Sequence, residues 1–219
     1  WFARQTYDCG GAAFPHVMEY LGLTVTTGDL PAPGKCKSVN GRLGPWPPYS
    51  YTIGVAGFAV QNLWLRYKYQ PDRAYLAETA YPAIRDVALF YSDFMDRCEV
   101  SSGGKVILAP SFSPEKWSLT EDFRYNRNCT FDIAFVRYTL EAAIEAAGIL
   151  NRDGELADRF KTQLQRLPDY PTTKGPEPVV VDVLDAPPTK YNIPVPTVPI
   201  FPGDQITWFS SKAEKRLFA

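Results

Sequence analysis

The chain has 219 residues, of which 45% are hydrophobic and 21% charged, and a formal net charge of -1 at pH 7. This composition is that of a globular domain and excludes a disordered chain. The balanced charge creates no field that would concentrate nucleic acid or anionic lipid, and the longest apolar stretches fall short of the roughly 20 residues that a membrane-spanning helix needs. We therefore expect a neutral partner or substrate, no nucleic acid and no membrane.

The first predicted element is a helix over residues 54–69, because apolar side chains surround nearly its whole circumference and should be buried on most sides. Pro71 ends it. Asp72 is a good N-cap for a second helical run over residues 74–97, which Pro82 should kink or restart. The two runs predict an antiparallel helical hairpin.

A second hairpin is predicted further along the chain. Apolar residues follow the i, i+3, i+4, i+7 spacing of one helix face over residues 131–148, and Gly148 stands where a C-cap belongs. Asp153 should then cap a partner helix over residues 155–166. Repeated hairpins predict an all-α fold, part of an α/α toroid or solenoid in which neighbouring hairpins bury one another's faces.

Two stretches fall outside the helices. Residues 100–128 are rich in loops and contain one short β-prone run, residues 105–108. Residues 168–207 are rich in proline but too apolar for a solvated linker, so we expect an extended segment laid over the helices. Catalytic and binding residues usually lie on loops that a rigid scaffold positions.

Both ends of the chain suggest that it is a piece of a longer protein. The first residue is Trp1, with no Met and no signal segment before it. Near the other end, Ser211 and Glu214 form an S-x-x-E capping box, which opens a helix shortly before Ala219.

Three blocks of sequence together resemble a known family. They are Tyr81–Tyr91, Pro110–Glu115 and Thr130–Arg137. Their order and spacing look like consecutive blocks of glycoside hydrolase family 95, the inverting 1,2-α-L-fucosidases, and of their six-hairpin relatives. The resemblance covers about residues 46 to 167. It implies that residues 1–219 are part of one (α/α)6 toroid catalytic domain, with hairpins at about 54–97 and 131–167, that acts on a neutral oligo- or polysaccharide without a cofactor.

The resemblance also assigns a role to Glu115. In that family the glutamate that closes the S-P-S-x-S-P-E block is the general acid, although Ala109 stands here where the family has serine. Glycoside hydrolysis needs a protonated carboxyl beside the leaving oxygen, and Phe112 and Trp117 would desolvate this one and raise its pKa. The alternative is a surface glutamate in a proline-containing turn.

An inverting hydrolase also needs a second group that activates water, with the two groups roughly 6.5–9.5 Å apart. In the fucosidases this group is an asparagine polarised by an aspartate. Neither of those two blocks occurs in the 219 residues. The chain is therefore either a piece of a larger enzyme or a branch with a changed mechanism.

Four further residues are candidates for substrate binding: Trp117, Asp132, His16 and Trp46. Tryptophans in or beside loops can pack on the apolar face of a sugar, although many aromatic residues belong to the core. Asp132 lies in the first turn of a predicted helix, which favours an interaction with the helix dipole. His16 lies at a predicted helix start, where packing or capping is the commoner role. It is the sole histidine, so the chain cannot form a metal cluster built from several histidines.

The four cysteines are Cys9, Cys36, Cys98 and Cys129, and none has the C-x-x-C spacing of a zinc site. They are buried free thiols or, in an exported protein, disulfides.

These observations predict a secreted or periplasmic glycoside hydrolase whose partners are a carbohydrate substrate and either the remainder of the parent chain or further copies of itself. The alternative is a non-catalytic helical-repeat protein that binds a glycan or another protein.

Overall fold

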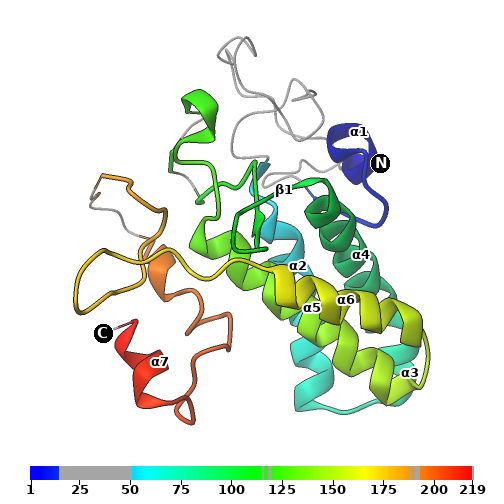
Figure 1. The fold of residues 1–219 in the computed structure, drawn as a ribbon. Coiled ribbons are helices and arrows are strands. Elements are labelled where there is room, and N and C mark those ends of the chain that lie inside the picture. The colour runs from blue at the N-terminus through cyan, green and yellow to red at the C-terminus, as the bar shows by residue number, and fades with distance from the viewer. Residues whose placement is uncertain (15–50, 115, 118–119, 188, 190–192, 219) are drawn as a thin grey trace.

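The computed structural model describes residues 1–14, 51–114, 116–117, 120–187, 189 and 193–218. It confirms the all-α prediction (Figure 1). The elements are α1 (Phe2–Tyr7), α2 (Gly54–Tyr69), α3 (Arg73–Tyr75), a π-helical turn (Leu76–Ala80), α4 (Tyr81–Arg97), β1 (Glu99–Val100), β2 (Val106–Ile107), a 3-10 turn (Glu121–Phe123), α5 (Thr130–Leu150), α6 (Gly154–Arg166), a 3-10 turn (Val195–Thr197) and α7 (Lys212–Arg216). In the described ranges the only sheet is the antiparallel pair of β1 and β2.

The first hairpin forms as its local signals predict. The Asp72 carboxylate accepts hydrogen bonds from the amides of Ala74 (2.9 Å) and Tyr75 (3.1 Å), and so caps the second arm. Pro82 is the second residue of α4 and follows the π-helical turn. Because proline has no amide hydrogen to donate, the helix changes its hydrogen-bond register just before it and restarts as α4.

The second hairpin corrects two predictions. Gly148 lies inside α5, which continues to Leu150 because its last residues still pack against the core, and Asn151 takes the left-handed C-cap conformation with φ 54°. Asp153 is the N-cap residue of α6, as predicted, but its carboxylate caps no amide. It accepts a hydrogen bond from the Tyr81 hydroxyl at 2.8 Å instead, and so ties the second hairpin to the first.

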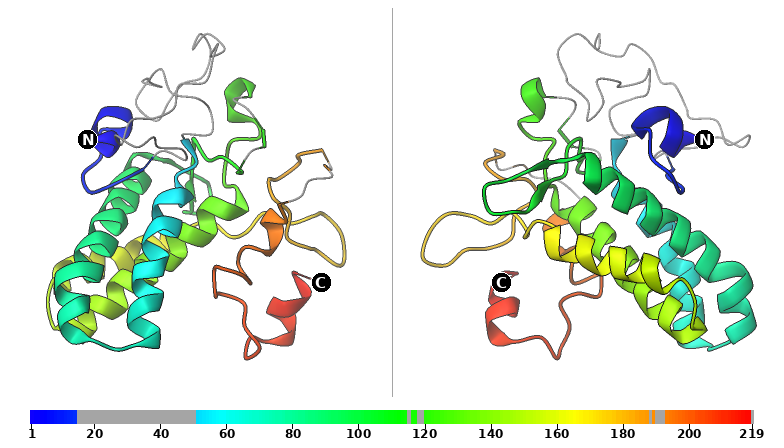
Figure 2. Two further views of the ribbon diagram at one scale, coloured as in Figure 1. Left: turned by 180° about the vertical axis from the view of Figure 1, so that it is seen from behind. Right: turned by 45° about the vertical axis from the view of Figure 1, so that its right-hand side comes forward.

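Helix α5 lies against α2, α4 and α6, and its inner face is fully buried (Figures 1 and 2). Gly57 permits the closest approach to α2. A Cβ atom at this position would lie 2.5 Å from the Thr139 hydroxyl and 2.8 Å from the Phe135 carbonyl oxygen. The Gly57 amide donates to the Tyr91 hydroxyl (2.7 Å), which donates to the Ile53 carbonyl (2.8 Å).

The proline-rich segment lies against the N-terminal half of α5. Thr130 donates from its amide to the Asp182 carbonyl (2.9 Å) and from its hydroxyl to the Val181 carbonyl (2.6 Å), and the Gln205 side chain donates to the Ala134 carbonyl (2.7 Å). Beyond it, α7 begins with the predicted capping box of Ser211 and Glu214. Within the described residues, no helix has the length and apolar character to span a membrane.

Candidate active site

The loop of residues 109–117 follows β2 and passes over the N-terminal ends of α2 and α5. Ser111, Phe112, Ser113 and Pro114 are all buried. The Phe112 ring packs on Tyr51, just before α2, with ring centroids 6.0 Å apart. Glu115, the predicted acid, lies outside the described residues, so its place in the site stays a prediction.

A buried carboxylate holds the first part of this loop. Asp132 accepts hydrogen bonds from the Gly54 amide at 2.7 Å, from the Ser111 hydroxyl at 2.9 Å and from the Phe112 amide at 3.0 Å. Burial raises the pKa of Asp132 to about 7, while these donors and the Cys129 thiol act in the opposite direction. One side chain thus joins α2, α5 and the loop.

Asp132 stands in the first turn of α5, where the sequence places it. It also receives the first amide of α2, so its charge interacts with the positive ends of two helices. Its side chain has no exposed surface, with a relative exposure of 0%. The structure therefore gives Asp132 contacts with the loop, and its predicted contact with a substrate remains untested.

A second carboxylate, on the proline-rich segment, holds the other part of the loop. The Ser113 hydroxyl donates to Asp182 Oδ2 at 2.6 Å, and Lys116 Nζ lies 3.5 Å from the same oxygen. Ser113 and Lys116 stand on either side of Glu115 in the sequence. Burial raises the pKa of Asp182, and Ser113, Lys116 and the nearby Trp117 indole oppose that rise.

Trp117 is half-buried and has a left-handed backbone with φ 55°. Its ring packs on Tyr125 with centroids 5.1 Å apart, and its carbonyl accepts from the Asn126 side chain at 2.8 Å. The indole Nε1 is buried and makes no full hydrogen bond within the described part, although it lies close enough to Asp182 to affect that carboxyl. Its predicted role in substrate binding stays open.

Asn126 connects this loop to the next. Its Oδ1 accepts from the amide (2.8 Å) and the hydroxyl (2.6 Å) of Thr120, and its carbonyl accepts from the Ser111 amide at 2.9 Å. The loops are thus fixed by buried hydrogen bonds, which is the arrangement that a precisely placed catalytic group requires.

The comparison with known families agrees with this arrangement. The family model described as "Glycosyl hydrolase family 95 catalytic domain" matches residues 2–177. The chain belongs to glycosyl hydrolase family 95. No curated protein matches the chain. The family match includes both hairpins and the loop of residues 109–117, and it ends before Asp182.

Several predicted positions of this family 95 chain lie outside the described residues, namely His16, Trp46, Cys36 and Glu115. The three other cysteines are buried and carry free thiols. Among the residues that the structure describes, no group of three or more His, Cys, Asp or Glu side chains could hold a metal ion. The expectations of no metal and no cofactor stay predictions.

Sequence reasoning missed Ser111, Ser113, Asn126 and Asp182. Both serines lie in the block that resembles the family, so their repetition around Phe112 was the available signal. Asp182 is the one charged residue in the run Val179–Val183. A lone carboxylate in an apolar run is a signal for a buried, paired side chain.

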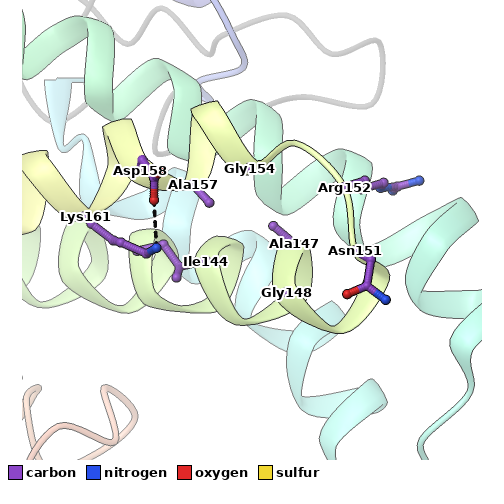
Figure 3. A pocket seen from close by; sticks show the side chains of 9 residues that line it. All are labelled: Ile144, Ala147, Gly148, Asn151, Arg152, Gly154, Ala157, Asp158 and Lys161. Atoms are coloured by element: carbon purple, nitrogen blue, oxygen red, sulfur yellow. Dashed lines mark hydrogen bonds and ion pairs between the residues drawn. The ribbon is translucent and has the colours of Figure 1, made fainter.

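A hollow of about 330 Å³ lies elsewhere, where α5 turns into α6 (Figure 3). Its lining residues are Ile144, Ala147, Gly148, Asn151, Arg152, Gly154, Ala157, Asp158 and Lys161. It opens at the C-terminal end of α5, whereas the loop of residues 109–117 meets the N-terminal end. It is therefore not part of the candidate active site.

Proposed function

We propose that this chain supplies the general acid, Glu115, of a glycoside hydrolase that cleaves a neutral oligo- or polysaccharide, with inversion at an α-L-fucoside as the reaction to test first. Membership of family 95 supports hydrolysis of a glycosidic bond. The observation that carries the assignment is that the four residues before Glu115 are buried and that three of them, Ser111, Phe112 and Ser113, donate hydrogen bonds to Asp132 or Asp182. A secreted or periplasmic enzyme suits such a substrate.

The chemistry follows from the place of the acid in the loop. As the glycosidic bond breaks, negative charge develops on the leaving oxygen, and Glu115 donates its proton to that oxygen. A general acid of this kind is kept protonated where its carboxyl is poorly hydrated. The chain contains no asparagine–aspartate pair of the fucosidase kind, so we expect the group that activates water to come from outside these residues.

Replacement of Glu115 with Gln in the natural protein that carries this chain tests the assignment. It removes the transferable proton and keeps the size of the side chain. Hydrolysis of an α-1,2-linked fucosyl disaccharide, whose leaving group needs protonation, should fall by about 10²–10⁴. Hydrolysis of α-L-fucosyl fluoride, whose leaving group needs less, should fall much less.

Glu121→Gln is the matched control, because Glu121 is an exposed carboxylate close by in the same loop region. It should leave both rates near those of the wild type. If Glu115→Gln changes neither rate, or lowers both equally together with the melting temperature, Glu115 is not the acid. Binding of the disaccharide without turnover by the wild-type protein would favour the alternative of a glycan-binding module.

A further inference from the structure

We propose that Asp182 is a positioning residue for the general acid: it holds the loop on both sides of Glu115 and so fixes the place from which the proton is donated. The proposal rests on the proposed function of Glu115. Asp182 lies beyond the part of the chain that the family match covers.

The contacts of Asp182 bracket the acid. Its Oδ2 accepts from the Ser113 hydroxyl at 2.6 Å and lies 3.5 Å from Lys116 Nζ. Between these two partners stand only Pro114 and Glu115. The two tethers restrict Ser113 and Lys116, the residues that lead into and out of this pair. Such restriction matters because a displacement of about 1 Å at a catalytic group can cost about 10²-fold in rate.

Asp182 is itself anchored to the helical scaffold. The amide of Thr130, the first residue of α5, donates to the Asp182 carbonyl at 2.9 Å. The Thr130 hydroxyl donates to the carbonyl of the preceding Val181 at 2.6 Å. The loop is therefore connected through Asp182 to α5, the helix at the centre of the hairpin packing. A loop held this way takes its position from a rigid element.

The pair of Asp182 and Lys116 is screened from solvent. The two side chains have relative exposures of only 12% and 11%. Coulombic interactions between such groups are much less weakened by salt and water than those of surface pairs. Salt and water therefore weaken the Asp182–Lys116 contact little while both partners remain charged.

We expect the same pair to influence the protonation of the proposed acid. Lys116 follows Glu115 directly in the sequence, and a neighbouring positive charge favours an ionised carboxyl. Asp182 offsets that charge. Among the described side chains that interact with Asp182, Ser113, Trp117 and the buried Cys129 thiol carry no charge that could do so. Loss of Asp182 should therefore lower the pKa of the general acid and shift the alkaline limb of the pH–rate profile to lower pH.

Two variants of the natural protein separate these effects. Asp182→Ala removes both tethers and should lower kcat/KM for the fucosyl disaccharide by about 10²-fold, while lowering that for α-L-fucosyl fluoride by less than about 10-fold. Asp182→Asn keeps an oxygen that can accept from Ser113 but removes the charge that pairs with Lys116. Asp182→Asn should therefore lose less kcat/KM than Asp182→Ala. Its alkaline limb should still lie at lower pH than that of the wild type.

Asp185→Asn is the matched control on the same segment. Asp185 pairs with Lys174 at 3.0 Å, but their side chains are 62% and 82% exposed, so this variant should keep the wild-type rates and pH profile. Hydrogen exchange of the backbone amides within residues 111–117, of which Pro114 has none, adds a readout independent of turnover. It should accelerate in Asp182→Ala and stay unchanged in Asp185→Asn, with α2 and α4 protected in both.

The outcomes distinguish this proposal from the one on which it rests. If Glu115→Gln discriminates between the two substrates but Asp182→Ala does not, Glu115 remains the acid and the positioning role is overturned. Wild-type exchange in residues 111–117 of Asp182→Ala would overturn it equally. Equal loss of both rates with a lower melting temperature would show that Asp182 only stabilises the fold. If Glu115→Gln does not discriminate, both proposals fail.

Discussion

Two regions of this molecule are held together by different means. The hairpin region, α2 to α6, packs apolar and aromatic side chains around α5, and Leu140 and Phe160 are at most 1% exposed. The site region, residues 109–129 with residues 179–183, is held by a few buried polar side chains. Asp132 and Asn126 each form several hydrogen bonds there and have no exposed surface.

The difference shows where each region is sensitive to change. A packed apolar core tolerates replacements that conserve volume, because its stability is shared among many weak contacts. A buried polar network depends on individual atoms, because each lost partner leaves a donor or acceptor unsatisfied. The placement of the hairpins therefore follows from pattern and volume, whereas the placement of the loop around Ser111 and Ser113 follows from Asp132 and Asp182.

The largest effect should come from the pH dependence of Asp132, where the two regions meet. Its pKa is about 7 in the folded protein, against about 4 for an unfolded aspartate. Between these values the folded state binds the proton and the unfolded state releases it, so raising the pH favours unfolding.

Relative to Asp132→Asn, the wild type should lose up to about 4 kcal/mol of unfolding free energy as the pH rises from 4 to 7. Denaturant titrations of both proteins across that range measure the difference. A free-energy gap that does not change with pH would mean that Asp132 titrates alike in both states, and that burial does not govern this junction.

The next largest effect on stability should come from adding side-chain volume in the hairpin region, at the contact between α2 and α5. In Gly57→Ala the new Cβ would lie 2.5 Å from the Thr139 hydroxyl and 2.8 Å from a backbone carbonyl, so the two helices must move apart. We expect the unfolding free energy to fall by about 3 kcal/mol, despite the higher helix propensity of alanine.

Gly148→Ala provides the matched control for that substitution. Gly148 also lies inside a helix, and a Cβ atom there would meet nothing within 4 Å. Its replacement should raise the unfolding free energy by about 0.5–1 kcal/mol through helix propensity alone. Equal effects of the two variants in urea denaturation would show that the close contact of α2 and α5 is not needed.

The hairpins could be predicted because their signals are local. The apolar pattern, Pro71 and the Asp72 cap fix the first hairpin within a few neighbouring residues. Prediction was wrong for Gly148 as the C-cap and for the partner of the Asp153 carboxylate, where tertiary contacts outweigh local preference. The helix continues past Gly148 because its end packs on the core, and the Asp153 carboxylate binds the Tyr81 hydroxyl. No pattern within α5 or α6 contains that information.

The site could be predicted only in part, for a related reason. The resemblance of residues 110–115 to the family points to Glu115, but the partners of the two serines lie far along the chain. Ser111 is 21 residues from Asp132, and Ser113 is 69 residues from Asp182. Asp182 lies in a segment without helical or strand periodicity, so nothing in its sequence indicates which part of the fold it meets.

The smallest effect should come from ion pairs on the surface of the hairpin region. It tests whether this region, unlike the site region, is insensitive to the loss of single polar contacts. Arg159 on α6 pairs with Asp93 at 2.7 Å and with Asp96 at 2.8 Å on α4. These are short contacts between oppositely charged groups, as in the site region, but the Arg159 side chain is 38% exposed. Water and salt screen it, and Asp96 also keeps Arg166 as a partner at 2.7 Å.

Arg159→Met retains an apolar stem against the helix and should therefore cost only about 0.5–1 kcal/mol of unfolding free energy at low salt, and less in 1 M NaCl. Lys161→Met, which removes a more exposed pair with Asp158, should cost almost nothing. Urea denaturation at two salt concentrations measures both. If Arg159→Met cost several kcal/mol regardless of salt, the hairpin region would also depend on single polar contacts. The contrast with Asp132 would then reflect the number of partners, because burial would no longer separate the two regions.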